Sequence, residues 1–210
     1  ELSADIEAIP LGQRAAVRRV FLADGDALVY PQEGLLQLLT QMQDAFPSLN
    51  RFSAYASPRS LTTKTQAELE TLQSKKLKIL YFGLESGDPQ TLELVNKGYS
   101  PDEMLTLCKK AQGAKMKLSI TAILGLGGQD RSTEHAVATA EWISKLSPEY
   151  FSLLTLFQRH NDDFFDLITP LTRGQILEES LAIVQQLQPQ RTILRSNHVS
   201  NLLALAGTYP

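Results

Sequence analysis

The sequence predicts an α/β fold built on a parallel sheet, and two observations support this. Short apolar runs alternate with amphipathic stretches of ten or more residues, and strands separated by such helices pair in parallel through crossovers. Apolar runs such as 117–124 and 150–156 show little polar alternation, which is typical of a sheet buried on both faces. Two arrangements stay open: a barrel of repeated βα units and a doubly wound open sheet.

Bulk composition indicates one soluble globular domain over residues 1–210. The chain is 43% hydrophobic, enough for a sizeable core, and its net charge of −3 gives no electrostatic footprint for nucleic acid. No apolar run approaches the ~20 residues of a membrane span. The single cysteine, Cys108, excludes a disulfide within the chain. This favours a reducing compartment, so we expect a cytoplasmic location and no membrane association.

The first elements are predicted from apolar spacing. Residues 5–18 have helical periodicity, although Pro10 interrupts the middle of this stretch. Residues 20–23 form a short apolar strand that ends at the turn-prone Asp24-Gly25-Asp26. Leucines at helical spacing predict a helix over 33–45.

Capping signals define the next elements. Residues 52–56 read as a strand that ends at Ser57-Pro58. Thr65 is a helix cap for residues up to 76, because Glu68 follows three residues later in the capping-box spacing. The apolar run 77–84 is the next strand.

Proline and glycine set the remaining boundaries. Asp88-Pro89 starts a helix with a cap followed by proline at the first position. Ser100-Pro101 repeats the device before a helix that reaches about Gln112, where Gly113 stops it. The same reasoning predicts strands at 117–124, 150–156 and 192–194, and helices at 132–146, 162–168 and 173–187.

Polar and glycine residues that follow strands are the first candidates for a site, because ligands of parallel βα folds bind at the carboxyl ends of the strands. In Asp24-Gly25-Asp26 the glycine admits a ligand and the carboxylates suit an ammonium group; the alternative is an ordinary turn. Glu85 lies in a glycine-flanked turn where a carboxylate can accept sugar hydroxyls, or it is a surface turn residue. Asp88 is better read as a helix cap.

Two later segments are also candidates. The run Ile123–Gly128 contains three glycines after a strong strand, but it is neither GxGxxG nor a P-loop. Its exposed backbone suits a flat base, and the alternative is a flexible loop. The run Arg195–Asn201 is dense in hydrogen-bonding groups, with His198 suited to acid–base work or substrate binding, unless the segment is a polar helix cap.

Three negative or neutral observations narrow the chemistry. His135 lies in a predicted helix and is read as a packing or surface residue. Cys108 is read as a small buried hydrophobe. The chain contains no HxH, CxxC or HExxH motif and no GxSxG elbow, so no metal site made by this chain alone is expected.

Taken in order, these motifs resemble those of radical SAM enzymes, and in particular the group labelled coproporphyrinogen-oxidase-like. The resemblance covers nearly the whole chain and is carried by DGDAL, YASP, GLESG, ILGLGG and RSNHVSN at strand ends. It implies a partial, TIM-like (βα) barrel that binds S-adenosylmethionine. With a [4Fe–4S] cluster such an enzyme cleaves this cofactor to a 5′-deoxyadenosyl radical, using a reductase, flavodoxin or ferredoxin as electron donor and a small molecule as substrate.

The resemblance also implies the parts of the site, but names no catalytic residue. It implies that Asp24, Gly25 and Asp26 bind the methionine amino group, and that Glu85 and Ser86 contact the ribose or the carboxylate. It implies that the adenine is contacted by Ile123, Leu124, Gly125, Leu126 and Thr155. It implies that the substrate is faced by Arg195, Asn197, His198 and Asn201.

One departure from the family is large. The CxxxCxxC motif that ligates the cluster is absent, and Cys108 stands alone on a predicted helix. We therefore expect the cluster ligands upstream of Glu1, in a barrel truncated at its N-terminal side. The alternatives are a barrel without a cluster that acts as a nucleotide-binding or interaction scaffold, and a non-radical barrel enzyme. The last would need a lysine or phosphate loop at a strand end, whereas Lys78 and Lys117 lie at strand starts.

Overall fold

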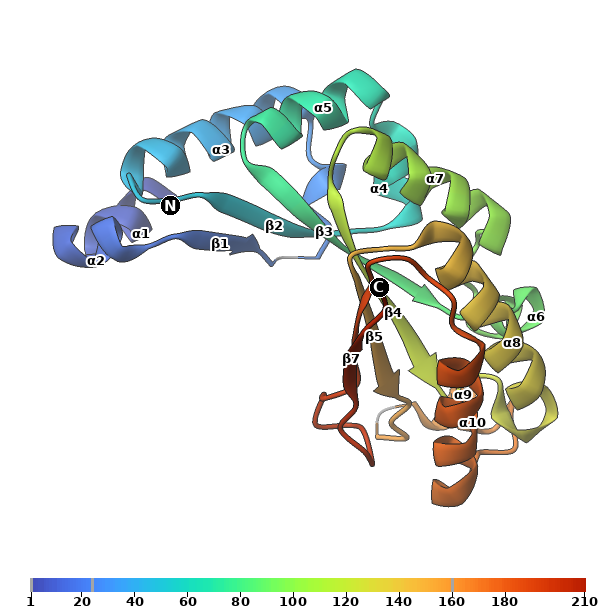
Figure 1. Ribbon diagram of the computed structural model, residues 1–210. Coiled ribbons are helices and arrows are strands. Elements are labelled where there is room, and N and C mark those ends of the chain that lie inside the picture. Colours follow the sequence, from blue (N-terminus) through green and yellow to red (C-terminus); the bar gives the residue numbers. More distant parts are fainter. Residues whose placement is uncertain (1, 24, 160) are drawn as a thin grey trace. The chain divides into compact units, whose positions relative to one another are not determined.

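The strands of the sheet follow one another in chain order, β1-β2-β3-β4-β5-β6-β7 (Figure 1). The computed structural model describes residues 2–23, 25–159 and 161–210. Pairing is parallel between β1 and β2, between β4 and β5, and between β5 and β6, whereas β7 is antiparallel to β6. The predicted α/β class, with a mostly parallel sheet of the TIM-like type, is confirmed. The strands are β1 (Arg19–Leu22), β2 (Arg51–Ala56), β3 (Leu77–Glu85), β4 (Lys117–Leu124), β5 (Tyr150–Thr155), β6 (Ile193–Arg195) and β7 (Ala206–Thr208).

The chain divides into two compact units, and the division falls within β3 and within the helix Pro101–Gly113. Unit 1 comprises Glu1–Tyr81 and Lys110–Lys117, and unit 2 comprises Phe82–Lys109 and Leu118–Pro210. That the whole chain is one domain stays a prediction.

Unit 1 holds β1, β2, the first part of β3 and the helices between them. Its helices are α1 (Leu2–Ala8), α2 (Leu11–Ala16), α3 (Gln32–Ala45), α4 (Pro58–Thr63) and α5 (Gln66–Ser74), with a 3₁₀ turn at Ala27–Val29. Pro10 separates α1 from α2, because proline cannot donate the helical hydrogen bond. The capping box of Thr65 and Glu68 is formed in both directions. The core between the helices and the strands includes Leu39, Phe52, Leu69, Leu72 and Leu80.

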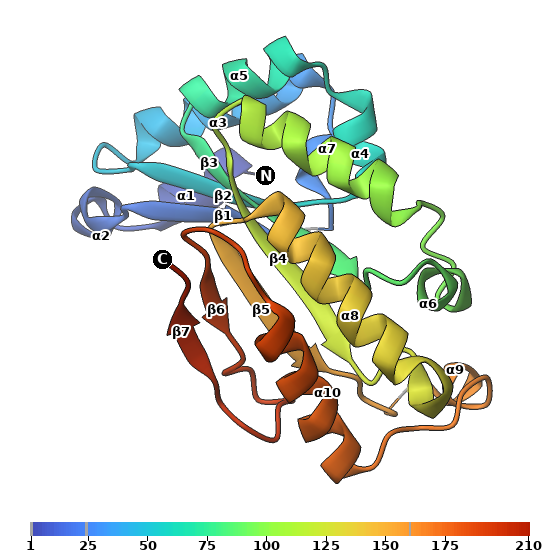
Figure 2. The same ribbon diagram turned by 45° about the vertical axis from the view of Figure 1, so that its right-hand side comes forward.

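Unit 2 holds the end of β3 and the remaining strands. Its helices are α6 (Pro89–Leu94), most of α7 (Pro101–Gly113), α8 (Gly128–Leu146), α9 (Asp162–Phe165) and α10 (Arg173–Gln186). Helices α8 and α10 lie side by side along this unit (Figure 2). Trp142 fastens α8 to α7, because its indole N–H donates to the carbonyl of Pro101 at 2.8 Å. The core includes Leu84, Ile120, Ile143, Phe151 and Leu153.

The structure departs from the sequence prediction at a few boundaries. Helix α4 was not predicted, because six polar-rich residues show no periodicity, yet Ser57 caps it through the backbone N–H of Ser60. Helix α8 begins at Gly128, before the predicted start at Ser132. Helix α9 is shorter than predicted and ends at Phe165. Strand β7 was missed because its three residues are all exposed and carry no apolar pattern.

Asp88 anchors the start of α6. One carboxylate oxygen accepts the backbone N–H of Thr91 at 2.9 Å and its hydroxyl at 2.7 Å, so the predicted helix cap is confirmed. The carboxylate also receives a two-pronged contact from Arg131 of α8, at 2.7 and 2.8 Å. Burial favours a higher pKa for Asp88, but the hydrogen bonds from Arg131 and Thr91 outweigh it and hold that pKa at about 2.

Replacing Asp88 separates these two contributions. We expect Asp88→Ala to lower the free energy of unfolding by about 1–2 kcal/mol, because a helix cap and an ion pair are lost together. Asp88→Asn keeps a capping oxygen and should lose less. Urea unfolding followed by circular dichroism measures both, with exposed Asp130→Asn in α8 as the control. Equal stability of Asp88→Ala and the wild type would contradict this role.

Candidate functional site

Strands β4 and β5 place two of the predicted residues at one edge of unit 2. Leu124 pairs with Thr155 at the carboxyl ends of these strands, so Gly125 and Thr155 follow at the same edge. They line a pocket of about 170 Å³, smaller than the ~300 Å³ at which ligand pockets usually begin, so it suits part of a ligand. Its other walls are mostly apolar and include Leu156, Phe165, Pro170, Leu171, Ile176 and Leu202.

Gly125 is required at the rim of this pocket. Its φ of +82° is a left-handed conformation that favours glycine. A Cβ at this position would lie 2.8 Å from Cδ1 of Ile176. The sequence signal of a glycine directly after an apolar strand therefore marks a true close approach of the backbone.

A buried carboxylate from α10 holds the same turn. Oε1 of Glu179 accepts the backbone N–H of Gly125 at 2.6 Å, and Oε2 accepts the hydroxyl of Ser132 at 2.5 Å. Burial raises the pKa of Glu179, while these two hydrogen bonds act in the opposite direction. Glu179 thus joins α10, α8 and the end of β4 at the edge of the pocket.

The polar segment after β6 is tied to the end of β5. The Thr155 hydroxyl donates to Oδ1 of Asn201 at 2.9 Å, and the Thr155 backbone N–H donates to the Ser200 hydroxyl at 3.0 Å. The Asn201 amide nitrogen donates to the carbonyl of Leu153 and to the Ser196 hydroxyl. Two candidate groups far apart in the sequence, Thr155 and the segment after β6, are therefore neighbours, and the hydrogen bonds of Asn201 connect them.

The other residues of this segment are exposed. Arg195 lies over the ring of Tyr150, with Cζ 4.9 Å from the ring centroid. Nδ1 of His198 is 2.8 Å from the Ser200 hydroxyl, and Asn197 is exposed beside it. On the neighbouring strand Ile123 is half-buried, whereas the side chains of Leu124 and Leu126 are buried, so those two can offer a ligand only their backbone.

Glu85 ends β3 in a strained conformation. Its φ is +64°, which is uncommon for any residue other than glycine and concentrates at functional sites. The carboxylate folds over Gly83, where a Cβ would come within 2.2 Å of Oε1 of Glu85. The same oxygen pairs with Lys97 at 3.0 Å, and the side chain stays partly exposed. Oε2 accepts no hydrogen bond from the described residues, so it can receive a ligand.

Ser86, next in the chain, lies in the interior. Its hydroxyl is 2.8 Å from Nδ1 of His135 and accepts the backbone N–H of Asp88 at 2.9 Å. Ser86 and His135 have no exposed surface, so the Ser86 side chain meets α8 in this structure rather than an open pocket. Burial lowers the pKa of His135 to about 4, against the raising influence of Asp88, so the imidazole is neutral. The reading of His135 as a packing residue agrees with this burial.

The predicted group after β1 lies in unit 1. Asp24 falls outside the described residues. Gly25 has a φ of +67° with open space where a side chain would be. Asp26 accepts the backbone N–H of Leu28 at 3.3 Å and that of Ser57 at 3.0 Å. Its carboxylate therefore ties the loop after β1 to the end of β2.

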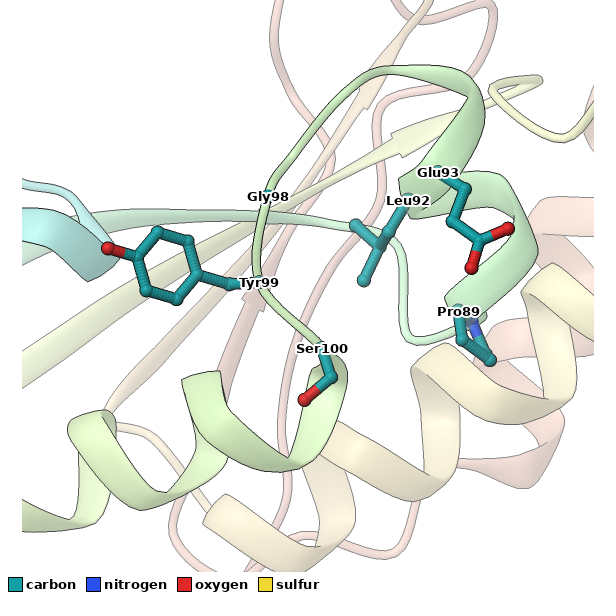
Figure 3. Close-up of a pocket in the computed structure, with 6 residues that line it drawn as sticks. All are labelled: Pro89, Leu92, Glu93, Gly98, Tyr99 and Ser100. Atoms are coloured by element: carbon teal, nitrogen blue, oxygen red, sulfur yellow. The ribbon is translucent and has the colours of Figure 1, made fainter.

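A second pocket in unit 2 contains none of the predicted residues. It measures about 240 Å³ and lies between α6 and the segment that leads into α7 (Figure 3). Its lining residues are Pro89, Leu92, Glu93, Gly98, Tyr99 and Ser100. The ring of Tyr99 points away from Leu92, and the hydroxyl of Ser100 is engaged by Glu103, so no polar groups converge there.

Comparison with known families decides the identity of the fold. A model of the radical SAM superfamily matches residues 5–143. The chain belongs to the radical SAM superfamily. Members generally use S-adenosylmethionine and a [4Fe–4S] cluster, and the resemblance based on strand-end motifs is confirmed at the level of the superfamily. A search of curated protein sequences found no match.

Solved radical SAM enzymes share the fold at low identity. Coproporphyrinogen III oxidase from Escherichia coli is 18% identical, with a TM-score of 0.66 over 84% of this chain and 43% of that chain. Elp3 from the archaeon Methanocaldococcus infernus is 12% identical, with a TM-score of 0.64 over 86% and 48%. Methylornithine synthase is 15% identical, with a TM-score of 0.59 over 91% and 54%. The chain thus spans about half the length of these structures.

The cluster of the radical SAM enzymes does not fit the residues described here. Cys108 is fully buried in α7, and burial raises the pKa of its thiol, the opposite of what a thiolate ligand needs. Within residues 2–23, 25–159 and 161–210, no group of three His, Cys, Asp or Glu side chains is placed to hold a metal ion. The reading of Cys108 as a buried hydrophobe is confirmed. No helix in the same ranges is long and apolar enough to cross a membrane.

Sequence reasoning missed Lys97 and Glu179. Lys97 carries no motif, and its partner Glu85 is found only once α6 folds back. Glu179 did carry a signal, because it lies between Ile176 and Ile183 at helical spacing, on the apolar face of α10. A charged residue on an apolar helix face is buried only when it has partners.

Proposed function

We propose that this chain is the S-adenosylmethionine-binding core of a radical SAM enzyme acting on a small molecule. The single observation that carries the proposal is the meeting of Gly125 and Thr155 in one pocket at the strand ends of unit 2. Membership of the radical SAM superfamily supports the reaction class. In this reaction class a [4Fe–4S] cluster would supply the electron that cleaves the cofactor and would receive it from a reductase, flavodoxin or ferredoxin, but no group of side chains among the described residues is placed to hold such a cluster.

The proposal assigns the adenine to the pocket at the ends of β4 and β5. Its apolar walls suit a flat ring, and Gly125, although largely buried, lines the pocket without a side chain, so a base can pack closely against it. The chain's own residues would exclude water here, while Glu179 fixes the turn and Asn201 fixes the segment that closes over Thr155. The exposed Arg195, Asn197 and His198 remain the proposed substrate-side groups.

Glu85 is the proposed ribose-binding residue. A carboxylate at a strand end can accept two hydroxyl hydrogen bonds, and Oε2 of Glu85 has no partner among the described residues. Lys97 pairs with Oε1 of this carboxylate, which is turned back over Gly83. Glu85 has a left-handed backbone conformation, which is strained, and this conformation directs its side chain back over Gly83.

Calorimetric titration with S-adenosylhomocysteine tests this assignment without needing the cluster. We expect the 210-residue chain to bind this nucleoside and Glu85→Gln to weaken binding about tenfold, because a carboxamide offers one acceptor oxygen in place of two. Gly125→Ala should weaken binding similarly, since its Cβ meets Ile176.

Glu93→Gln is the matched control, because Glu93 is exposed on α6 and lines the second pocket, which contains none of the proposed nucleoside contacts. Its affinity should equal that of the wild type. Absence of nucleoside binding by the wild-type chain at millimolar concentration would overturn the proposed function. Unchanged affinity in Glu85→Gln would remove Glu85 from the site.

A further inference from the structure

One face of the strands in unit 1 carries three aromatic rings. The centroid of Phe21 lies 4.9 Å from that of Tyr55 and 5.2 Å from that of Tyr81, both edge to face. These residues come from β1, β2 and β3 and share one face of the strands. Phe21 is 39% exposed and Tyr55 is 47% exposed. Helices α3 and α5 lie on the opposite face (Figure 1).

Two arginines lie on the same face, next to the rings. Arg19 precedes Phe21 by two residues, and side chains two apart on a strand point to one side. Arg19 is the registered partner of Arg51 on β2, so their Cα atoms are about 4.8 Å apart. Two guanidinium groups, each with five donors, therefore flank the aromatic cluster.

The positive charge of this pair is not compensated by the protein. Neither Arg19 nor Arg51 forms an ion pair with a carboxylate of the described residues, although like charges directly opposite on neighbouring strands are destabilising. Nε of Arg51 is buried and has no hydrogen-bond acceptor among those residues. The Arg51 side chain as a whole is partly exposed, so its guanidinium, which no carboxylate neutralises, can receive an anion from solvent.

An ordinary structural role explains these observations less well. Charges on an edge strand discourage aggregation, and Arg19 on β1 fits that role. Arg51 does not, because β2 is an inner strand of the sheet and its Nε is shielded from solvent. Nor does that role explain three rings, two of them exposed and one half-buried, gathered beside the pair.

We infer that Arg19 and Arg51, with Phe21, Tyr55 and Tyr81, form a binding site for an organic anion with a flat aromatic body. The two guanidinium groups bind the oxyanion, a carboxylate or a phosphate, and the rings contact the body. The site lies wholly in unit 1. Its assignment as the place where the substrate binds rests on the proposed function, whereas the binding itself does not.

Fluorescence titration of the 210-residue chain with 2-naphthyl phosphate and 2-naphthoate tests the inference. We expect at least one to bind, and the preferred one shows whether phosphate or carboxylate is the recognised group. Uncharged 2-naphthol should bind at least about tenfold more weakly than the anions, because it lacks the charge-assisted hydrogen bonds. Arg19→Gln and Arg51→Gln should each weaken binding of the anion about tenfold, and Phe21→Leu should weaken binding of the anion and of 2-naphthol.

Arg59→Gln is the control, because Arg59 is exposed on α4 in the same unit. Arg19→Gln and Arg51→Gln should be at least as stable as the wild type, since each removes a like-charge contact. Failure of both anions to bind, equal affinity for 2-naphthol, or unchanged affinity in Arg51→Gln would overturn the inference. Titration of the same samples with S-adenosylhomocysteine tests the proposed function separately, because its variants lie in unit 2.

Discussion

Gly87→Ala should destabilise unit 2 by about 3 kcal/mol or more, the upper range of overpacking in a dense interior. A Cβ on Gly87 would lie 2.3 Å from the carbonyl oxygen of Ala138 and 2.6 Å from the backbone nitrogen of Thr139. Both are backbone atoms in the middle of α8, so no side chain can turn aside to make room. The Gly87 N–H also donates to the Thr139 hydroxyl at 2.9 Å, a bond that the displaced backbone would lose.

Native-state hydrogen exchange by mass spectrometry checks this effect and locates it. Amides of α8 and β4 should exchange much faster in Gly87→Ala. The control is Gly207→Ala in the same unit, where nothing lies within 4 Å of the new Cβ, and it should behave as the wild type. A Gly87→Ala protein within 0.5 kcal/mol of the wild type would show that α8 and this turn do not approach so closely.

Glu179→Ala should have an effect of comparable size. It leaves the Gly125 N–H and the Ser132 hydroxyl without their acceptor in a buried place, at about 1–3 kcal/mol each. Glu179→Gln keeps an acceptor oxygen and should retain most of the stability. Exposed Glu178→Ala, one residue earlier, is the control. If Glu179→Ala and Glu178→Ala unfold at the same urea concentration, the buried carboxylate does not hold the turn.

The pH dependence of stability gives an independent check on the same residue. Burial raises the pKa of Glu179 above its ordinary 4.5, so its contribution is present below pH 4.5 and is lost as pH rises through the folded pKa. His135 acts oppositely: its pKa falls from 6.5 to about 4, so its contribution is present above pH 6.5 and is lost toward pH 4. Glu179→Gln removes the first dependence and keeps a neutral side chain beside His135, whose Nε2 lies 3.8 Å from Oε1 of Glu179. Its stability should therefore rise more steeply than that of the wild type between pH 4 and 6.5.

The strands and long helices were predictable because each depends on neighbours in the sequence. Thr65 and Glu68 are three residues apart, so the capping box that they form is visible before folding. The apolar run of β4 likewise needs no partner to be recognised. Helix α4 and strand β7 could not be predicted, because their short, polar or exposed residues take their structure from Ser57 and from β6.

The site was predictable only in outline. Parallel topology places strand ends together, which is why Gly125, Thr155 and Asn201 were sensible candidates. Which side chains point inward depends on contacts across the fold. Ser86 forms a hydrogen bond with His135, 49 residues away, and Asn201 forms one with Thr155, 46 residues away. No local sequence pattern encodes such pairs.

Strand β7 has a consequence for strand addition. It takes up the outer hydrogen-bonding groups of β6 in antiparallel fashion, and the pairing extends to Ser196 and Tyr209 beyond the strands. The Tyr209 hydroxyl fastens this segment to the carbonyl of Val184 in α10. The outer edge of β6 is therefore already paired and cannot accept a further parallel strand. On this side of the sheet the exposed edge strand is β7. It is three residues long, too short for stable β-pairing with another chain.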